Sequence, residues 1–176
     1  PIAVEAGIVM PPDVYLSDVS RICRDRGVVL IFDDSVSGLG RTGRTCAWTY
    51  SKAEPDILIM PRSLGGGIYP IYATCHTFDL DFFYQKHPFV HVSTFGGAEV
   101  GCEAALCALW KLSSAALYDN VIVRGEEFRS AVSSKSIGAN SPVRAVRGVG
   151  LLNAIECRDV HTAVELEREL IERGVL

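Results

Sequence analysis

Long hydrophobic runs are missing from this chain of 176 residues. Its longest apolar stretches, residues 28–32 and 104–110, are much shorter than the roughly 18–20 residues that a membrane-spanning helix needs. Clusters of positive charge are missing too, because 17 Lys and Arg residues are scattered among 21 Asp and Glu residues, for a net charge of −4. Neither a membrane nor a nucleic acid is therefore expected as a partner.

Paired metal-ligand spacings are also absent. The six cysteines include no C-x-x-C pair, so no metal site is expected. The four histidines have no supporting spacing either: His76, His87, His91 and His161. Cys102 and Cys107 fall in an apolar helical stretch, where small buried thiols are the simpler interpretation. No signal peptide is visible, which favours a reducing cytoplasm.

What the chain does contain is an alternation of short apolar runs with helical segments. Hydrophobic residues make up 48% and charged residues 22% of the sequence, as in ordinary globular proteins. Buried strands are predicted at residues 28–32, 57–60, 69–75 and 90–93. Helices are predicted at residues 14–26, 98–112, 118–132 and 161–173. This order predicts an α/β fold with a parallel sheet.

A polar stretch at residues 133–141 separates two parts of the chain. Strands are predicted around Gly148 and Gly150, beyond this linker. The sequence therefore predicts a domain boundary here, with one domain at residues 1–140 and a second beginning at residues 141–176. The chain opens on Pro-Ile-Ala-Val without an initiator Met, and we expect it to begin inside a larger fold.

Unusual side chains follow three of the predicted strands. They are Asp33-Asp34, Arg62-Ser63, which three glycines follow in the chain at residues 65–67, and Ser93-Thr94. Because ligands of open α/β sheets gather at the carboxyl ends of strands, we expect these segments to form one site. The pair Asp33-Asp34 has a second interpretation, in which the carboxylates only cap a helix or hold a loop.

A glycine-rich loop follows the first of these strands. Residues 38–43 match G-x-G-x-x-G, and residues 38–45 match a Walker A loop if Arg44 replaces its lysine. Four residues separate Asp33 from Gly38, whereas a dinucleotide fingerprint opens directly from a strand into a helix. A tight structural turn explains the loop better, and a nucleotide-binding module is the weaker hypothesis.

Several blocks occur in one collinear order along the chain. They are Pro1-Ile2-x-x-Glu5-x-Gly7, Pro11-Pro12-x-x-Tyr15-Leu16, Ile31-x-Asp33-Asp34-x-x-x-Gly38-Leu39-Gly40-Arg41-Thr42-Gly43, Pro55-Asp56-Ile57-Leu58, Leu64-Gly65-Gly66-Gly67-x-x-Pro70-Ile71, Ser93-Thr94-Phe95-Gly96-Gly97 and Val146-Arg147-Gly148-x-Gly150-Leu151. Together they resemble the class III pyridoxal-phosphate-dependent aminotransferases over essentially the whole chain. The block His87-Pro88-Phe89-x-His91 is most similar to the acetylornithine, ornithine and putrescine branch.

The resemblance implies a fold type I transferase. Residues 1–140 would be part of the large domain, a mostly parallel sheet with flanking helices, and residues 141–176 the start of the small C-terminal domain. It implies pyridoxal 5'-phosphate as cofactor, with Asp33 paired with the ring nitrogen so that the protonated ring is an electron sink. Thr94 would bind the cofactor phosphate of the neighbouring subunit, which implies a homodimer.

The chain departs from the family pattern at the lysine that forms the Schiff base. Arg62 stands there, and a guanidinium is neither an imine-forming amine nor a base at neutral pH. No other lysine lies in a matching context: Lys52, Lys86, Lys111 and Lys135. Val36 replaces the glutamine beside the cofactor's phenolic oxygen. Further family positions differ: Asp34 for Glu, Ala3-Val4 for Gln-Gly and Ala98-Glu99 for Asn-Pro.

The resemblance therefore predicts a truncated and catalytically impaired aminotransferase-like protein. Its ancestral reaction would move an amino group from an amine or ω-amino acid to a 2-oxo acid. No catalytic residue is intact, and covalent attachment of the cofactor is not expected. The alternatives are a non-catalytic pseudoenzyme that dimerises with an active paralogue or binds a partner, and a catalyst of other chemistry on an aminated cofactor. A sequence error at position 62 stays open as well.

Overall fold

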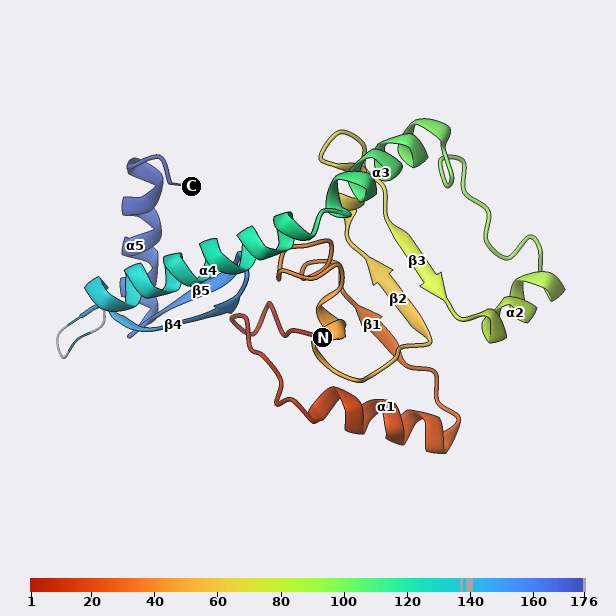
Figure 1. Ribbon diagram of the computed structural model, residues 1–176, viewed down its shortest axis with the longest axis horizontal. Coiled ribbons are helices and arrows are strands. Elements are labelled where there is room, and N and C mark those ends of the chain that lie inside the picture. The colour runs from red at the N-terminus through yellow and green to blue at the C-terminus, as the bar shows by residue number, and fades with distance from the viewer. Residues whose placement is uncertain (137, 139–140, 176) are drawn as a thin grey trace.

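The computed structural model describes residues 1–136, 138 and 141–175. Its helices and strands, in chain order, are α1 (Tyr15–Arg26), β1 (Ile31–Asp33), β2 (Ile57–Met60), β3 (Ala73–His76), α2 (Asp81–Lys86), α3 (Glu99–Leu112), α4 (Ala115–Ser136), β4 (Val143–Val149), β5 (Leu152–Cys157) and α5 (Val160–Glu172). Short 3-10 helices lie at η1 (Ala47–Tyr50), η2 (Arg62–Gly65) and η3 (Phe78–Leu80). The long helix α4 connects the region around β1–β3 with the β4–β5 hairpin and α5 (Figure 1).

The first sheet contains β1, β2 and β3 in that order. β1 and β2 are parallel, with Asp33 opposite Ile59, and β3 runs antiparallel to β2, with Cys75 opposite Leu58. The predicted parallel arrangement therefore holds for the strand pair that precedes Asp33-Asp34 and Arg62, and β3 makes the sheet mixed. The predicted strands around Gly148 form a separate antiparallel hairpin, β4–β5.

The core lies in two contiguous clusters around this sheet. One is centred on Leu30, Phe32 and Ala53, and side chains of α1 pack against it. The other is built from Leu39, Cys46, Met60, Leu64 and Ala105, which joins the glycine loop, β2, η2 and α3. Trp48 and Leu58 contact both clusters.

The prediction that residues 28–32 form a strand buried on both faces is wrong. The strand is shorter, and Val28 and Ile31 are 53% and 54% exposed while Phe32 is 5% exposed. Alternating side chains of a strand point to opposite faces, and in the described part of the chain only the face with Leu30 and Phe32 is covered.

The predicted strand at residues 90–93 is also wrong. This segment is an irregular connection between α2 and α3, and Val92 is 78% exposed. A strand needs a neighbour for its backbone hydrogen bonds, and no other strand pairs with this segment in the described residues. Thr94 therefore does not follow a strand.

Helix α4 is longer than predicted. It begins at Ala115 and continues to Ser136, through the first part of the predicted polar linker. The domain boundary is expected directly after residue 140. Residue 140 and its neighbours 137 and 139 lie outside the described residues. No single described helix is long and apolar enough to cross a membrane, and α3 with α4 meets that criterion only as a pair bent by 73°.

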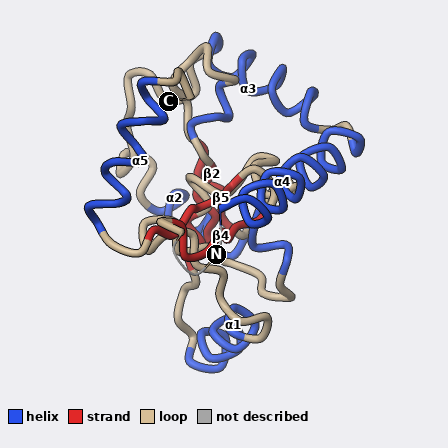
Figure 2. The backbone as a smooth tube through the Cα atoms, turned by 90° about the vertical axis from the view of Figure 1, so that its left-hand side faces the viewer, coloured by secondary structure: helices blue, strands red, loops and turns tan. Residues whose placement is uncertain are grey.

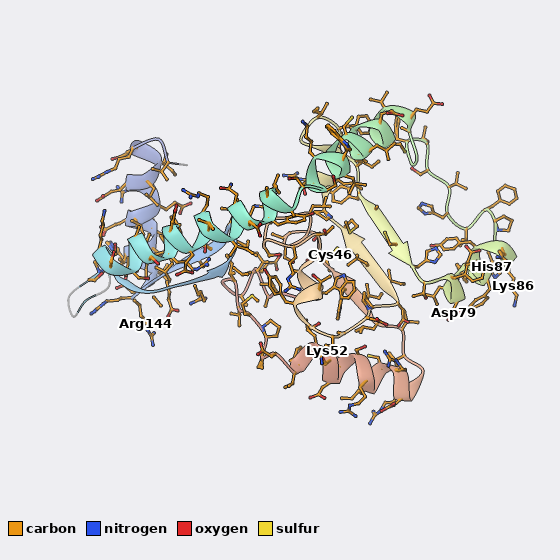
Figure 3. The ribbon with its side chains drawn as sticks, viewed as in Figure 1. Cys46, Lys52, Asp79, Lys86, His87 and Arg144 are labelled. Atoms are coloured by element: carbon orange, nitrogen blue, oxygen red, sulfur yellow. The ribbon has the colours of Figure 1, made fainter. Side chains whose placement is uncertain are left out.

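The cysteines differ in their surroundings. Cys102 and Cys107 are exposed, contrary to the prediction, because the described chain leaves the outer face of α3 uncovered. Cys46 is buried beside the sheet (Figure 3). Burial, with a smaller contribution from the carboxylate of Asp34, raises the pKa of the Cys46 thiol to about 11. Cys46 is therefore a protonated core residue at neutral pH.

Candidate functional site

A pocket of about 570 Å³ opens beside the C-terminal ends of β1 and β2. Residues that follow β1, residues that follow β2 and one residue of the glycine loop line it together, among them Ser35, Val36, Arg41, Arg62, Ser63 and Tyr69. Because parallel strands end at the same edge of a sheet, segments separated by more than 20 residues in the sequence meet here. A larger hollow of about 670 Å³ lies at the opposite end of these strands and holds none of the predicted site residues.

Asp33 is the last residue of β1 and lies two residues before the pocket wall at Ser35. Its side chain is exposed, and its Oδ1 accepts a hydrogen bond from the Ser35 backbone N–H at 2.9 Å. Hydrogen bonds from Ser35 hold the pKa of the Asp33 carboxyl below its ordinary value. Asp33 therefore presents a negative charge at this edge of the sheet at neutral pH.

Asp34 has a different environment, although it is the next residue. Its side chain is fully buried, and its Oδ2 accepts the backbone N–H of Ala47 at 2.7 Å. Its Oδ1 accepts the hydroxyl of Ser37. Both carboxylate oxygens are therefore occupied in holding the glycine loop, so the loop-holding interpretation of this pair applies to Asp34 alone.

The glycine loop is a packed turn. The N–H of Leu39 donates to the Thr45 carbonyl at 2.6 Å, and that of Gly40 donates to the Arg44 carbonyl at 3.1 Å. A helix N-terminus that binds phosphate needs such N–H groups unpaired, and this loop leads into the short η1 and not into an α-helix. These contacts favour the interpretation of the glycine loop as a tight structural turn, and they speak against a nucleotide-binding loop.

The outer side of this loop packs against α4 and the β4–β5 turn. The Leu151 N–H donates to the Arg41 carbonyl at 2.9 Å. A Cβ atom at Gly150 would lie 2.6 Å from the carbonyl carbon of Thr42, and one at Gly125 of α4 would overlap the Gly150 carbonyl oxygen. Figures 1 and 2 both place α4 beside the hairpin. This close packing fixes the backbone from which the Arg41 side chain extends to the pocket.

Arg62 is the first residue of η2 and lines the pocket together with Val36. None of the four lysines of the chain lines the pocket; Lys52 lies near α1 and Lys86 on α2 (Figure 3). Among the described residues that line the pocket there is also no His, Cys, Asp or Glu. The pocket therefore contains two permanent cations, Arg41 and Arg62, and no amine or neutral-pH base.

The structure does not bring Thr94 into this pocket. Thr94 is exposed in the connection between α2 and α3, which runs along the outer side of the sheet region in Figure 1. Of the residues singled out from the sequence, Asp33, Val36 and Arg62 therefore meet at one edge of the sheet, and Thr94 lies apart.

Sequence reasoning missed Arg41 and Tyr69 as lining residues. A signal for Arg41 was present, since an arginine inside a run of tight-turn glycines has to point its long side chain out of the turn. Tyr69 comes two residues after Gly67, the last of the three glycines that end and follow η2, and only the path of that loop places it against the pocket.

Comparison with known proteins decides the family, because the family model for class III aminotransferases matches residues 1–176. The chain belongs to the class III aminotransferase family. It is 35% identical to the putrescine aminotransferase of Pectobacterium atrosepticum over 176 residues, which are 100% of this chain and 38% of that protein. The predicted family and the fold type I transferase fold are confirmed, and the cofactor of this family is pyridoxal phosphate.

Solved structures of class III aminotransferases show the same arrangement. The ornithine aminotransferase of Toxoplasma gondii superposes with a TM-score of 0.91 at 35% identity, over 100% of this chain and 42% of that chain. The acetylornithine aminotransferase of Elizabethkingia anophelis superposes with a TM-score of 0.86 at 34% identity, over 99% of this chain and 43% of that chain. The chain thus spans about two fifths of the length of these relatives.

Proposed function

We propose that this class III aminotransferase-like protein descends from an enzyme that moved an amino group from an amine or ω-amino acid to a 2-oxo acid, and that it no longer turns over. The observation that carries the proposal is Arg62, which lines the pocket at the edge of the sheet where no lysine is present. In this proposal residues 1–140 form part of the large domain and residues 141–176 the start of the small domain. Its location is the cytoplasm.

The residues at this edge of the sheet, Asp33 beside the pocket and those that line it, fit part of the family's cofactor. The ionised carboxylate of Asp33 suits the protonated ring nitrogen of pyridoxal phosphate, and a volume of about 570 Å³ is within the range of small-molecule sites. When bound, this cofactor supplies an electron sink for the substrate carbon. The side chain of Val36 offers no hydrogen bond to the cofactor. The fit is therefore limited to the carboxylate of Asp33, the volume of the pocket and the two arginines on its wall, Arg41 and Arg62.

The residues that line the pocket do not fit the chemical step of amino transfer. Amino transfer needs an amine that attaches the cofactor and then carries a proton, and a guanidinium does neither at neutral pH. The described residues that line the pocket include no amine, imidazole or carboxylate to take over the proton at neutral pH. General acid–base catalysis contributes about 10²–10⁴-fold to rates, so its loss together with the covalent step removes useful turnover.

An activity assay of the purified full-length protein tests this proposal. We expect amino transfer from putrescine or ornithine to 2-oxoglutarate, with pyridoxal phosphate added, to stay at the level of the protein-free control. Typical enzymes turn over about 1–10³ times per second. Turnover in that range by the unaltered protein would overturn the proposed loss of activity.

A second candidate function is a non-catalytic subunit, either in a homodimer or beside an active paralogue. It is favoured by the exposure of Thr94 outside its own chain's pocket, where it could reach the cofactor phosphate of a neighbouring subunit. The connection that holds Thr94 and the helix α3 after it carry exposed apolar side chains: Phe89, Val92, Phe95, Val100 and Trp110. We expect the protein to sediment as a dimer or to co-purify with the paralogue, and a strictly monomeric protein would count against this function.

A further inference from the structure

Two arginines from separate elements meet in the pocket. Arg41 belongs to the glycine loop that follows β1 in the chain, and Arg62 belongs to η2, which follows β2. Both line the same pocket of about 570 Å³. Their side chains make no hydrogen bond or ion pair with any residue that the structure describes. Both residues are exposed, so a ligand can reach them.

Hydrogen bonds and packing hold the backbone in place at both arginines. The Arg41 carbonyl accepts the N–H of Leu151, and the loop around it is locked against Gly150. Arg62 starts a 3-10 turn in which the Leu64 N–H donates to the Pro61 carbonyl at 3.0 Å, and Leu64 is anchored in the core. Both guanidiniums therefore extend from backbones that are held in place, so an anion that enters the pocket can be bound from two separate elements.

The charges around the pocket are not balanced. No acidic side chain lines it within the described residues, and the nearest along the chain is Asp33, whose Oδ1 already accepts the Ser35 N–H. Two positive charges and one negative charge leave a surplus of one positive charge. The hydroxyls of Ser35 and Ser63 on the pocket wall add neutral donors.

We propose that this pocket binds a small oxyanion without a covalent bond, with Arg41 and Arg62 as the two guanidinium ligands. The oxyanion is a carboxylate or a phosphate group, both of which match the fork of N–H donors on arginine. This anion site rests on the proposed function, because both depend on a guanidinium in place of an amine at position 62. An ancestral catalytic pocket has in this view become an anion-binding pocket.

Calorimetric titration of the full-length protein tests the site. Succinate and inorganic phosphate are the probes, at low ionic strength, because neither can form a covalent bond with a lysine. We expect at least one probe to bind with a dissociation constant of about 1 mM or below. Arg41→Gln and Arg62→Gln are each expected to weaken binding about 10-fold or more, since hydrogen bonds to charged groups are the strong ones. Arg26→Gln, which removes an exposed arginine of α1, is the matched control and is expected to change nothing.

The outcomes separate the sources of the anion. Binding of succinate alone identifies a carboxylate site, binding of phosphate alone identifies a phosphate site, and either result supports the proposal. No binding of either probe by the unaltered protein, or equal binding by the Arg41→Gln/Arg62→Gln double variant, would overturn it. Failure of the proposed function is detected separately, since turnover is assayed without either probe.

Discussion

Replacing Asp34 by alanine is expected to lower the free energy of unfolding by about 3–5 kcal/mol, whereas the same change at Asp33 is expected to lower it by less than about 1 kcal/mol. Asp34 is 0% exposed and accepts hydrogen bonds from the Ser37 hydroxyl and the Ala47 N–H. Its removal leaves both donors buried without an acceptor, at about 1–3 kcal/mol each, and opens a cavity beside the core. Asp33 is exposed and loses only the Ser35 contact.

Urea denaturation of the two variants beside the unaltered protein measures this difference. Asp34→Asn keeps the shape and one acceptor oxygen, so we expect it to unfold at a urea concentration between those of Asp34→Ala and the unaltered protein. This variant also covers the case in which Asp34→Ala does not fold. Equal losses for Asp33→Ala and Asp34→Ala would show that the two carboxylates do not have the separate roles that the structure gives them.

The parts of the fold that depend on local signals were predictable. The apolar run of β2 and the end of α1 at Gly27, which has a left-handed φ of 63°, follow from residue type alone. The failures have a common physical cause. Val28, Ile31, Val92 and Cys102 are apolar but exposed, because apolar composition says that a side chain tends to be buried and does not say which surface will cover it.

The site was predictable where sheet topology determines it. Asp33 and Arg62 come together because β1 and β2 are parallel neighbours, which the alternating pattern implies. The position of Thr94 depends on the path of an irregular connection, for which no strand ending provides a guide. The sequence indicated only that the Arg41 side chain leaves the turn; which way the loop faces is set by its packing on Gly150, more than 100 residues away in the sequence.

Replacing Arg62 by lysine is expected to restore covalent attachment of pyridoxal phosphate, from none in the unaltered protein to most of the variant. The change puts a primary amine on a pocket wall that also carries Val36 and adjoins the ionised Asp33. A deprotonated lysine amine attacks an aldehyde carbon, whereas a guanidinium does not. Arg41→Lys is the matched control, because it places an amine in the same pocket at a position that the family does not use for attachment.

We expect that a guanidinium at position 62 blocks covalent attachment of the cofactor, in a pocket that keeps its other residues for binding it. Incubation with pyridoxal phosphate, reduction with borohydride and peptide mass spectrometry test it most directly, with the unaltered protein, Arg62→Lys and Arg41→Lys side by side. We expect a modified peptide that contains residue 62 in Arg62→Lys and no such specific modification in the other two proteins. Specific modification of any lysine in the unaltered protein, or no modification of residue 62 in Arg62→Lys, would contradict it.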